Sequence, residues 1–150
     1  MKVVFMSDSH GYDDRVEKII SDNKDADYFY HLGDICTDYS HNKLNIIQGN
    51  NDYDYYPRKI VAQFEGFKVL MLHSDRIYYN RLVTLKNLAK DNNCQIVLYG
   101  HTHCCSDDTI DGIRLLNPGS LCYNRDGSKL SYLIGYFTEK EYSFQRVTIE

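Results

Sequence analysis

The sequence lacks any apolar run that could cross a membrane, which takes about 20 residues in a helix. The apolar segment that follows Met1 is also too short for the core of a signal peptide. No repeat, low-complexity tract or Gly/Ser linker interrupts the chain, and 150 residues suit one domain better than two. We therefore expect a cytoplasmic protein with a single domain, residues 1–150, and no membrane attachment.

An excess of basic residues is missing too. The formal net charge is −4, from 17 Lys and Arg against 21 Asp and Glu, whereas a nucleic-acid-binding face normally adds positive charge. The charge therefore argues against a nuclease and against a nucleic-acid partner. It does not exclude a small anionic substrate, because bound cations can supply positive charge.

The five cysteines form no Cys-x-x-Cys pair, which is the usual half of a structural zinc site. The run from His101 to Cys105, His-Thr-His-Cys-Cys, suggests a zinc finger but lacks a second ligand pair. An odd number of cysteines without a secretory signal favours reduced thiols in the cytosol. We interpret Cys104 and Cys105 as ordinary buried or half-buried thiols.

Short apolar runs predict buried strands in the first two thirds of the chain. They span Val3–Met6, Asp27–His31, Leu44–Gln48, Phe67–Leu72 and Gln95–Tyr99. Two apolar stripes at helical spacing, one over residues 12–20 and one over residues 82–89, predict helices between them. The order of strand, helix and strand indicates a largely parallel sheet.

The last third of the chain alternates apolar and polar residues more strictly, as antiparallel strands do. The alternating segments are Thr109–Ile110, Ile113–Leu116, Leu130–Phe137 and Tyr142–Ile149, and Asp111-Gly112 is a hairpin turn signal. We expect these segments to form an antiparallel sheet packed against the first one. With helices outside both sheets, the predicted fold class is α/β, a four-layer αββα sandwich.

Each of the five buried runs is followed by Asp, Asn or His, the residue types that bind divalent metals. Singly these motifs are weak, because Gly-Asp after a strand is usually a turn and an Asp before a helix often caps it. In open α/β sheets, however, ligands bind beyond the carboxyl ends of the strands, and here five ends carry such residues. Residues two apart in extended backbone also face the same side. The residues of these types that follow the five runs are Asp8, His10, Asp34, Asn50, Asn51, Asp52, His73, Asp75, His101 and His103.

In this order, Asp-x-His, Gly-Asp, Gly-Asn-x-Asp, His and Gly-His-x-His resemble the signature of the calcineurin-like metallophosphoesterases. The segment Asn117-Pro118-Gly119-Ser120 is similar to the small bacterial and archaeal phosphodiesterases of that superfamily. The resemblance covers about residues 3–120 and implies the αββα sandwich. It also implies that one metal is held by Asp8, His10, Asp34 and His103, and the other by Asp34, Asn50, His73 and His101, with Asp34 as the bridge.

The resemblance implies a hydrolase acting on ester bonds, a metal-dependent phosphodiesterase for small or nucleotide-like phosphodiesters. Its cofactors would be two divalent metal ions, manganese first and iron, nickel or zinc as alternatives, which activate a hydroxide. The expected partner is a small-molecule phosphoester, and a homo-oligomer is compatible with the sequence. Asp52 is a candidate catalytic residue that orients a ligand, but a solvent-facing turn would explain it equally well. His31 could likewise orient a ligand or simply pack.

Larger relatives carry Gly-Asp-x-x-Asp-Arg-Gly and Gly-Asn-His-Glu, where this chain has Gly-Asp-Ile-Cys-Thr-Asp-Tyr and Gly-Asn-Asn-Asp. The arginine that grips phosphate and the histidine that protonates a leaving group are both missing, which makes a protein phosphatase a poor match. Asp75, which follows His73-Ser74, has no explanation from the sequence. The alternative function is a non-catalytic scaffold or binding module, because the retromer scaffold subunit resembles this fold and has lost metal ligands. The seven filled ligand positions favour the enzyme.

Overall fold

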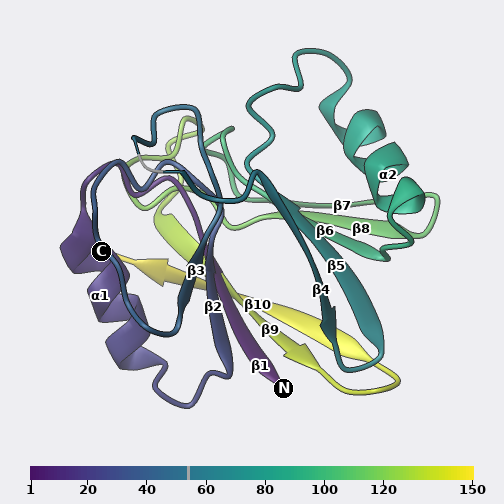
Figure 1. Cartoon of the computed structure of the whole chain (residues 1–150), viewed down its shortest axis with the longest axis horizontal. Coiled ribbons are helices and arrows are strands. Elements are labelled where there is room, and N and C mark those ends of the chain that lie inside the picture. Colours follow the sequence, from purple (N-terminus) through teal and green to yellow (C-terminus); the bar gives the residue numbers. More distant parts are fainter. Residues whose placement is uncertain (54) are drawn as a thin grey trace.

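The computed structural model describes residues 1–53 and 55–150. Within them the chain forms ten strands and two helices, and Figure 1 shows α1 and α2 on opposite flanks of the strands. Neither helix in this part of the chain is long and apolar enough to span a bilayer. In chain order the elements are β1 (Lys2–Met6), α1 (Asp13–Asp22), β2 (Tyr28–His31), β3 (Leu44–Ile46), β4 (Lys59–Phe64), β5 (Phe67–Leu72), α2 (Arg81–Asp91), β6 (Ile96–Tyr99), β7 (Ser106–Ile110), β8 (Ile113–Asn117), β9 (Leu130–Phe137) and β10 (Tyr142–Ile149).

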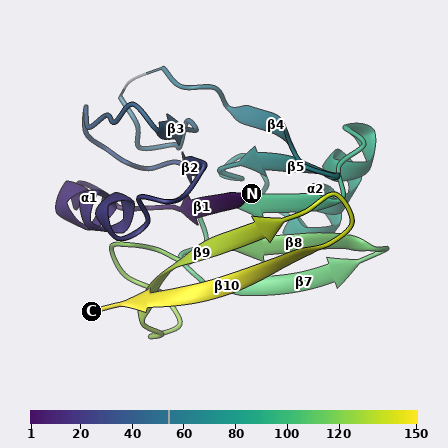
Figure 2. The same cartoon turned by 90° about the horizontal axis from the view of Figure 1, so that it is seen from below.

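The strands form two five-stranded sheets, one in the order β10-β9-β1-β2-β3 and the other in the order β4-β5-β6-β8-β7. Strands β1, β2 and β3 pair in parallel, as do β5, β6 and β8. Strands β9, β4 and β7 pair in the antiparallel sense with their neighbours, and β10 pairs with β9 in the same way. Seen from below, the order of layers is α1, first sheet, second sheet, α2 (Figure 2). The predicted four-layer αββα sandwich is confirmed.

The expected division into a parallel sheet and a separate C-terminal antiparallel sheet is wrong. Both sheets are mixed, because β9 pairs with the free side of β1 and β8 pairs in parallel with β6. Strand β9 can occupy an inner position because it is apolar on both faces. Its Leu133 and Phe137 pack between the sheets, and Tyr132 and Ile134 pack toward α1. The sequence analysis also missed β4, an edge strand whose residues are mostly half-buried or exposed.

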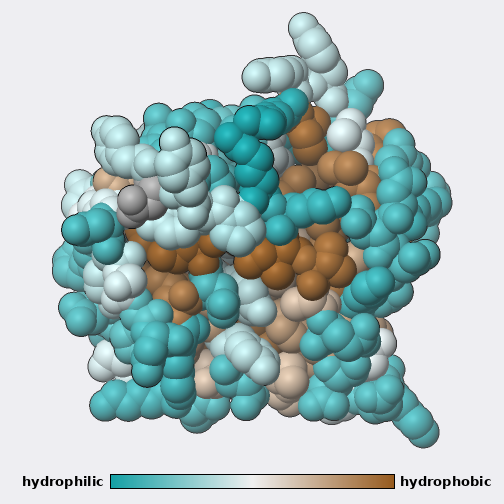
Figure 3. All heavy atoms as spheres, viewed as in Figure 1, coloured by the Kyte–Doolittle hydropathy of each residue, from teal (hydrophilic) through white to brown (hydrophobic). Residues whose placement is uncertain are grey.

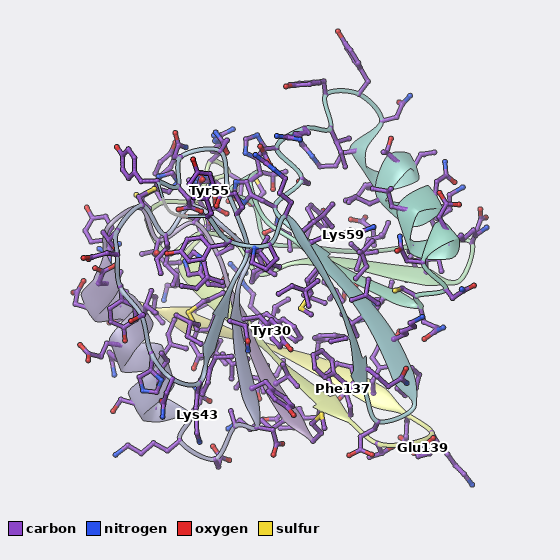
Figure 4. All side chains as sticks on the ribbon, viewed as in Figure 1. Tyr30, Lys43, Tyr55, Lys59, Phe137 and Glu139 are labelled. Carbon is purple, nitrogen blue, oxygen red and sulfur yellow. The ribbon has the colours of Figure 1, made fainter. Side chains whose placement is uncertain are left out.

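Alternation along the strands builds the core. On β1, Val3 and Phe5 belong to the cluster between the two sheets, whereas Val4 and Met6 belong to the cluster under α1. Tyr30 and Phe137 also point into the space between the sheets (Figure 4). Hydrophobic side chains gather on the visible face over the edge strands β3 and β4, where this core approaches the surface (Figure 3).

The fold brings the loops that follow β1, β2, β3, β5 and β6 to one edge of the sandwich, at the top of Figure 1. Two backbone hydrogen bonds, from Asp8 to the Gly33 carbonyl and from His10 to the Asp34 carbonyl, join the loops after β1 and β2 at 3.0 Å each. The His101 amide reaches from the second sheet to the Asp8 carboxylate at 3.0 Å. These bonds hold the ends of β1, β2 and β6 against one another.

Candidate metal centre

The candidate ligands lie in turns rather than in extended backbone. Positive φ angles occur at five of the seven, with values between 44° and 76°: Asp8, His10, Asp34, His101 and His103. Such angles are uncommon for residues other than glycine, and they cluster at functional sites where surrounding structure holds them. The sequence argument that residues two apart converge because the chain is extended is therefore wrong. The pairs converge because left-handed turns fold the chain back at the strand ends.

Asp8 is fully buried, and its two carboxylate oxygens differ. Oδ2 accepts hydrogen bonds from the Ser7 hydroxyl at 2.6 Å and from the His101 amide at 3.0 Å. Oδ1 has no hydrogen-bond partner among the described residues, yet it lies 3.4 Å from His103 Nε2 and 3.8 Å from His10 Nε2. Burying a carboxylate oxygen without a partner is costly. The geometry therefore fits a cation held at Oδ1.

The histidine rings are oriented from behind. His73 Nδ1 donates to the Leu32 carbonyl at 2.8 Å, and His103 Nδ1 donates to the Tyr123 carbonyl at 3.0 Å. Because a carbonyl can only accept, Nδ1 carries the proton in both rings and Nε2 is left to bind a metal. His10 Nδ1 lies 3.6 Å from Cys36 Sγ, and its buried Nε2 has no hydrogen-bond partner in the described part of the chain.

Asp34 stands between two of these rings. Its Oδ2 lies 3.5 Å from His10 Nε2 and 3.4 Å from His73 Nε2. Asn51 holds the carboxylate in place, donating from its backbone amide at 2.9 Å and from its side-chain amide at 3.0 Å. Asn50 adds an oxygen, since its Oδ1 lies 3.1 Å from His73 Nε2. The Asp34 carboxylate therefore lies near both imidazoles, and the ligand atoms of Asp8, Asp34 and His73 are close enough together to hold one ion.

His101 lies beside the cluster, with its ring centroid 5.1 Å from that of His73, but it joins none of the groups of metal-ligand atoms among the described residues. A cavity of about 300 Å³ opens at this point, at the lower end of the size of small-molecule sites. Two larger hollows of about 530 Å³ lie elsewhere and hold none of the candidate ligands. The cavity at the cluster is lined by His10, Asp34, Asn50, Asn51, His101, His103, Cys122, Tyr123 and Arg125.

Without a metal ion, protons on the neighbouring histidines compensate the negative charges of Asp8 and Asp34. Burial disfavours the charge of Asp8, but the nearby imidazoles of His10, His103 and His73 and the Ser7 hydroxyl hold its pKa well below the usual range. Burial also disfavours a charged His73, but the hydrogen bond to Asp34 and the charges of Asp8 and Asp34 raise its pKa to about 9. A divalent cation would take over the role of these protons, because it offers positive charge to the same atoms.

Asp52 lies behind the ligands. Its carboxylate accepts hydrogen bonds from the backbone amides of Asp34 at 2.9 Å, Cys36 at 2.8 Å and Gly49 at 2.7 Å. These contacts favour the orienting interpretation over the solvent-facing turn, since the carboxylate ties the turn at Asp34 to the turn before Asn50. All three bonds go to backbone amides, and none goes to a side-chain atom that would bind a metal.

His31 is fully buried and neutral. The Gly33 amide donates to Nδ1 at 3.2 Å, so Nε2 carries the proton and donates to Ser9 Oγ at 2.9 Å. Burial lowers the pKa of His31 to about 4. The ring links the loops after β1 and β2. No side chain fits at Gly33 itself, because a Cβ there would lie 2.6 Å from His73 Nδ1.

The zinc-finger interpretation finds no support, since Cys104 and Cys105 join no group of metal-ligand atoms among the described residues. The five cysteines, all within that part of the chain, are free thiols. A further grouping of Asp34, Cys36 and Asp52 is better explained by packing. Burial raises the pKa of Cys36 to about 12, so it stays a thiol, and Asp52 is occupied by backbone amides.

Sequence reasoning missed several contacts at this site. Asn51 stands where larger relatives have a histidine, and its two hydrogen bonds to Asp34 follow from the turn between Asn50 and Asp52. The Asn-Pro-Gly-Ser segment supported the family resemblance, but nothing in the sequence provided a physical reason for it. In the structure, Ser120 Oγ donates to the Asp8 carbonyl at 2.9 Å. Tyr123 and Arg125 carried no signal.

The two facing mixed sheets and the converging carboxylates and imidazoles define a metal-binding α/β sandwich of the phosphoesterase class. The chain belongs to the calcineurin-like phosphoesterase superfamily, whose domain model matches residues 1–140.

Two relatives support this membership. A probable metallophosphoesterase of Mycoplasma pneumoniae is 31% identical over 140 residues, covering 86% of this chain and 84% of the relative. A phosphodiesterase of Methanocaldococcus jannaschii is 25% identical over 141 residues, covering 81% of this chain and 85% of the relative.

Solved structures show the same fold. A conserved protein of Streptococcus pneumoniae TIGR4, described as a predicted phosphoesterase, superposes with a TM-score of 0.84 at 25% identity, covering 98% of this chain and 88% of that one. Vps29 of Entamoeba histolytica in complex with Zn²⁺ superposes with a TM-score of 0.78 at 16% identity, covering 99% of both chains. The latter likeness concerns the fold alone.

Proposed function

We propose that the protein is a metal-dependent phosphodiesterase that hydrolyses small or nucleotide-like phosphodiesters. The observation that carries the proposal is the pair of buried atoms without hydrogen-bond partners, Asp8 Oδ1 and His10 Nε2, which face each other inside the ligand cluster. Superfamily membership and the phosphodiesterase name of the Methanocaldococcus relative support the same reaction class.

The donor set fits divalent transition metals, because it combines imidazole nitrogens with carboxylate and amide oxygens. We propose two ions, manganese first and iron, nickel or zinc as alternatives. When bound, such ions lower the pKa of a water molecule and neutralise charge on phosphoryl oxygens. One ion would be held by Asp8, His10, Asp34 and His103, and the other by Asp34, Asn50, His73 and His101.

The chain's own part is to hold these donors ready and to admit the substrate. Hydrogen bonds to Leu32 and Tyr123 keep the metal-facing nitrogens of His73 and His103 free of protons in the neutral ring. The cavity then gives a phosphoester access to the half-buried edge of the cluster. Asn51 also lines the cavity, but its side-chain amide is bonded to Asp34 and cannot donate a proton to a leaving group.

The direct test strips the protein with a chelator and reloads it separately with Mn²⁺, Fe²⁺, Ni²⁺ and Zn²⁺. Each form is assayed against bis(p-nitrophenyl) phosphate, p-nitrophenyl phosphate and cyclic and linear nucleotide phosphates. We expect diester hydrolysis that requires a metal and disappears on chelation. Protein that binds metal but hydrolyses no phosphoester would overturn the proposal.

That outcome would favour the alternative, a non-catalytic binding module on the same fold. The likeness to Vps29 in fold keeps this alternative in view. Against it stands the set of seven ligand side chains, because buried carboxylates cost free energy unless a cation or a proton compensates them.

A further inference from the structure

One basic side chain reaches the cavity at the metal centre. Arg125 lines the same cavity as His10, Asn50 and His103. The residue is exposed, and no hydrogen bond or ion pair joins its guanidinium to a described residue. A permanent positive charge therefore stands free at the mouth of the cavity.

Four other arginines have their guanidinium groups bound to carbonyls or carboxylates, whereas Arg58 and Arg76 have no such bond among the described residues but do not line this cavity. The bound ones are Arg15 on the Leu121 carbonyl, Arg81 on the Ile77 carbonyl, Arg114 on the Asp107 carboxylate and Arg146 on the Lys129 carbonyl. Arg125 has a counter-charge only if an anion enters the cavity.

The backbone that carries Arg125 is fixed to the centre. The Arg125 amide donates to the His103 carbonyl at 2.9 Å, and the Tyr123 carbonyl accepts from His103 Nδ1 at 3.0 Å. Asn124 is buried, and its side chain accepts from the Ser120 amide at 2.8 Å and donates to the Lys129 carbonyl at 2.7 Å. The loop therefore presents the arginine at a set position beside His103.

The chemistry of the expected occupant matches. Some oxygens of a phosphoester take no part in the bond changes of hydrolysis. A guanidinium can bind two such oxygens with parallel N–H donors. The Gly-Asp motif of this chain lacks the arginine found in larger relatives, and the seven metal ligands offer no other fixed positive charge. We propose that Arg125 binds the non-reacting oxygens of the substrate phosphate and thereby sets the preference of the site for phosphoesters. This inference rests on the proposed function.

Inorganic phosphate and bis(p-nitrophenyl) phosphate test the inference in Mn²⁺-loaded protein. Phosphate affinity is measured by calorimetry and kcat/KM by release of nitrophenol, for the wild type, Arg125→Ala, Arg125→Lys and Lys140→Ala. The last removes one positive charge from the exposed turn between β9 and β10. Arg125→Ala should weaken phosphate binding and lower kcat/KM by about 10- to 100-fold, the usual effect of losing a charged hydrogen bond. Arg125→Lys should recover part of this loss, and Lys140→Ala should match the wild type.

Bound metal is counted in every variant, and melting checks the fold. Unchanged phosphate affinity and kcat/KM in Arg125→Ala overturn the inference and leave the proposed function standing. A loss of metal in Arg125→Ala, repeated in Arg125→Lys, assigns the residue to the metal site and also overturns it. A wild type that binds phosphate through Arg125 but hydrolyses nothing overturns the proposed function alone. A wild type that binds no phosphate overturns the inference.

Discussion

The carboxylate of Asp52 accepts a hydrogen bond from the backbone amide of Asp34 at 2.9 Å, so one acidic residue fixes the position of another. The same carboxylate also accepts from the amides of Cys36 and Gly49. Three amide donors therefore converge on its two oxygens. Asp52 thereby acts on the site through the backbone of its ligands.

Replacing Asp52 with asparagine puts an NH₂ group against at least one of these amide donors. We expect the affinity for Mn²⁺ to fall by about 10- to 100-fold, as it does when groups that orient a ligand are changed. Metal titration of chelated protein measures the change. Asp38→Asn is the control, because Asp38 is exposed on the loop between β2 and β3 that also carries Asp34. Equal affinities in the two variants would remove Asp52 from the site.

Asp34 faces both His10 and His73, whereas Asn50 contacts His73 alone. Asp34→Ala should therefore deplete both proposed ions, and Asn50→Ala should weaken only one. Elemental analysis after dialysis against Mn²⁺ counts the ions, and the diester assay gives the accompanying loss of rate. A bridging role is excluded if Asp34→Ala retains one ion per chain at full occupancy while Asn50→Ala does the same.

The apo protein should be folded, because three hydrophobic clusters pack the sheets and helices without help from the metal centre. Metal at 100 times its dissociation constant should add about 2.7 kcal/mol, equivalent to a rise in Tm of roughly 5–10 °C for a chain of this size. Thermal melting of chelated and Mn²⁺-loaded protein measures the shift. An unfolded apo form would show instead that the metals are structural.

His31 should make apo stability depend on pH. Its pKa is about 4 in the fold and near 6.5 when unfolded, so its contribution is full above pH 6.5 and is lost as the pH falls toward 4. Between pH 7.5 and 5, the stability advantage of the wild type over His31→Gln should shrink by about 2 kcal/mol. Denaturant unfolding of both chelated proteins at the two pH values tests this. A constant advantage would mean that the buried ring is not held neutral.

Hydrolysis should depend steeply on the acidity of the leaving group. The side chain of Asn51 is engaged with Asp34 and has no proton to give, and a positioned acid is typically worth about 10²–10⁴ in rate. Aryl phosphodiesters of graded phenol pKa provide the series. With chemistry shown to limit the rate, a flat series would reveal a general acid at the site, and Asp75, half-buried with a charge that acts on His101, would be examined first.

The sequence by itself determined the helices and nine of the ten described strands in outline, because these depend on local patterns. An apolar run such as Phe67–Leu72 is buried wherever it pairs, and polar residues after it must leave the sheet at its end. The family motifs added the prediction that the ligand candidates at these strand ends form one site, which no local pattern indicates.

Only the tertiary structure decided which edges pair and which contacts hold the ligands. Strand β9 joins β1 although more than 120 residues separate them along the chain, since the free side of β1 and the apolar faces of β9 meet only after both sheets form. In the same way, Asp52 finds its three amides and Arg125 reaches His103 through turns with left-handed residues, whose direction the sequence does not encode locally. Hydrogen bonds between loops depend on which loops lie close together in the folded chain. The contacts that support the site could therefore not be predicted from local sequence patterns.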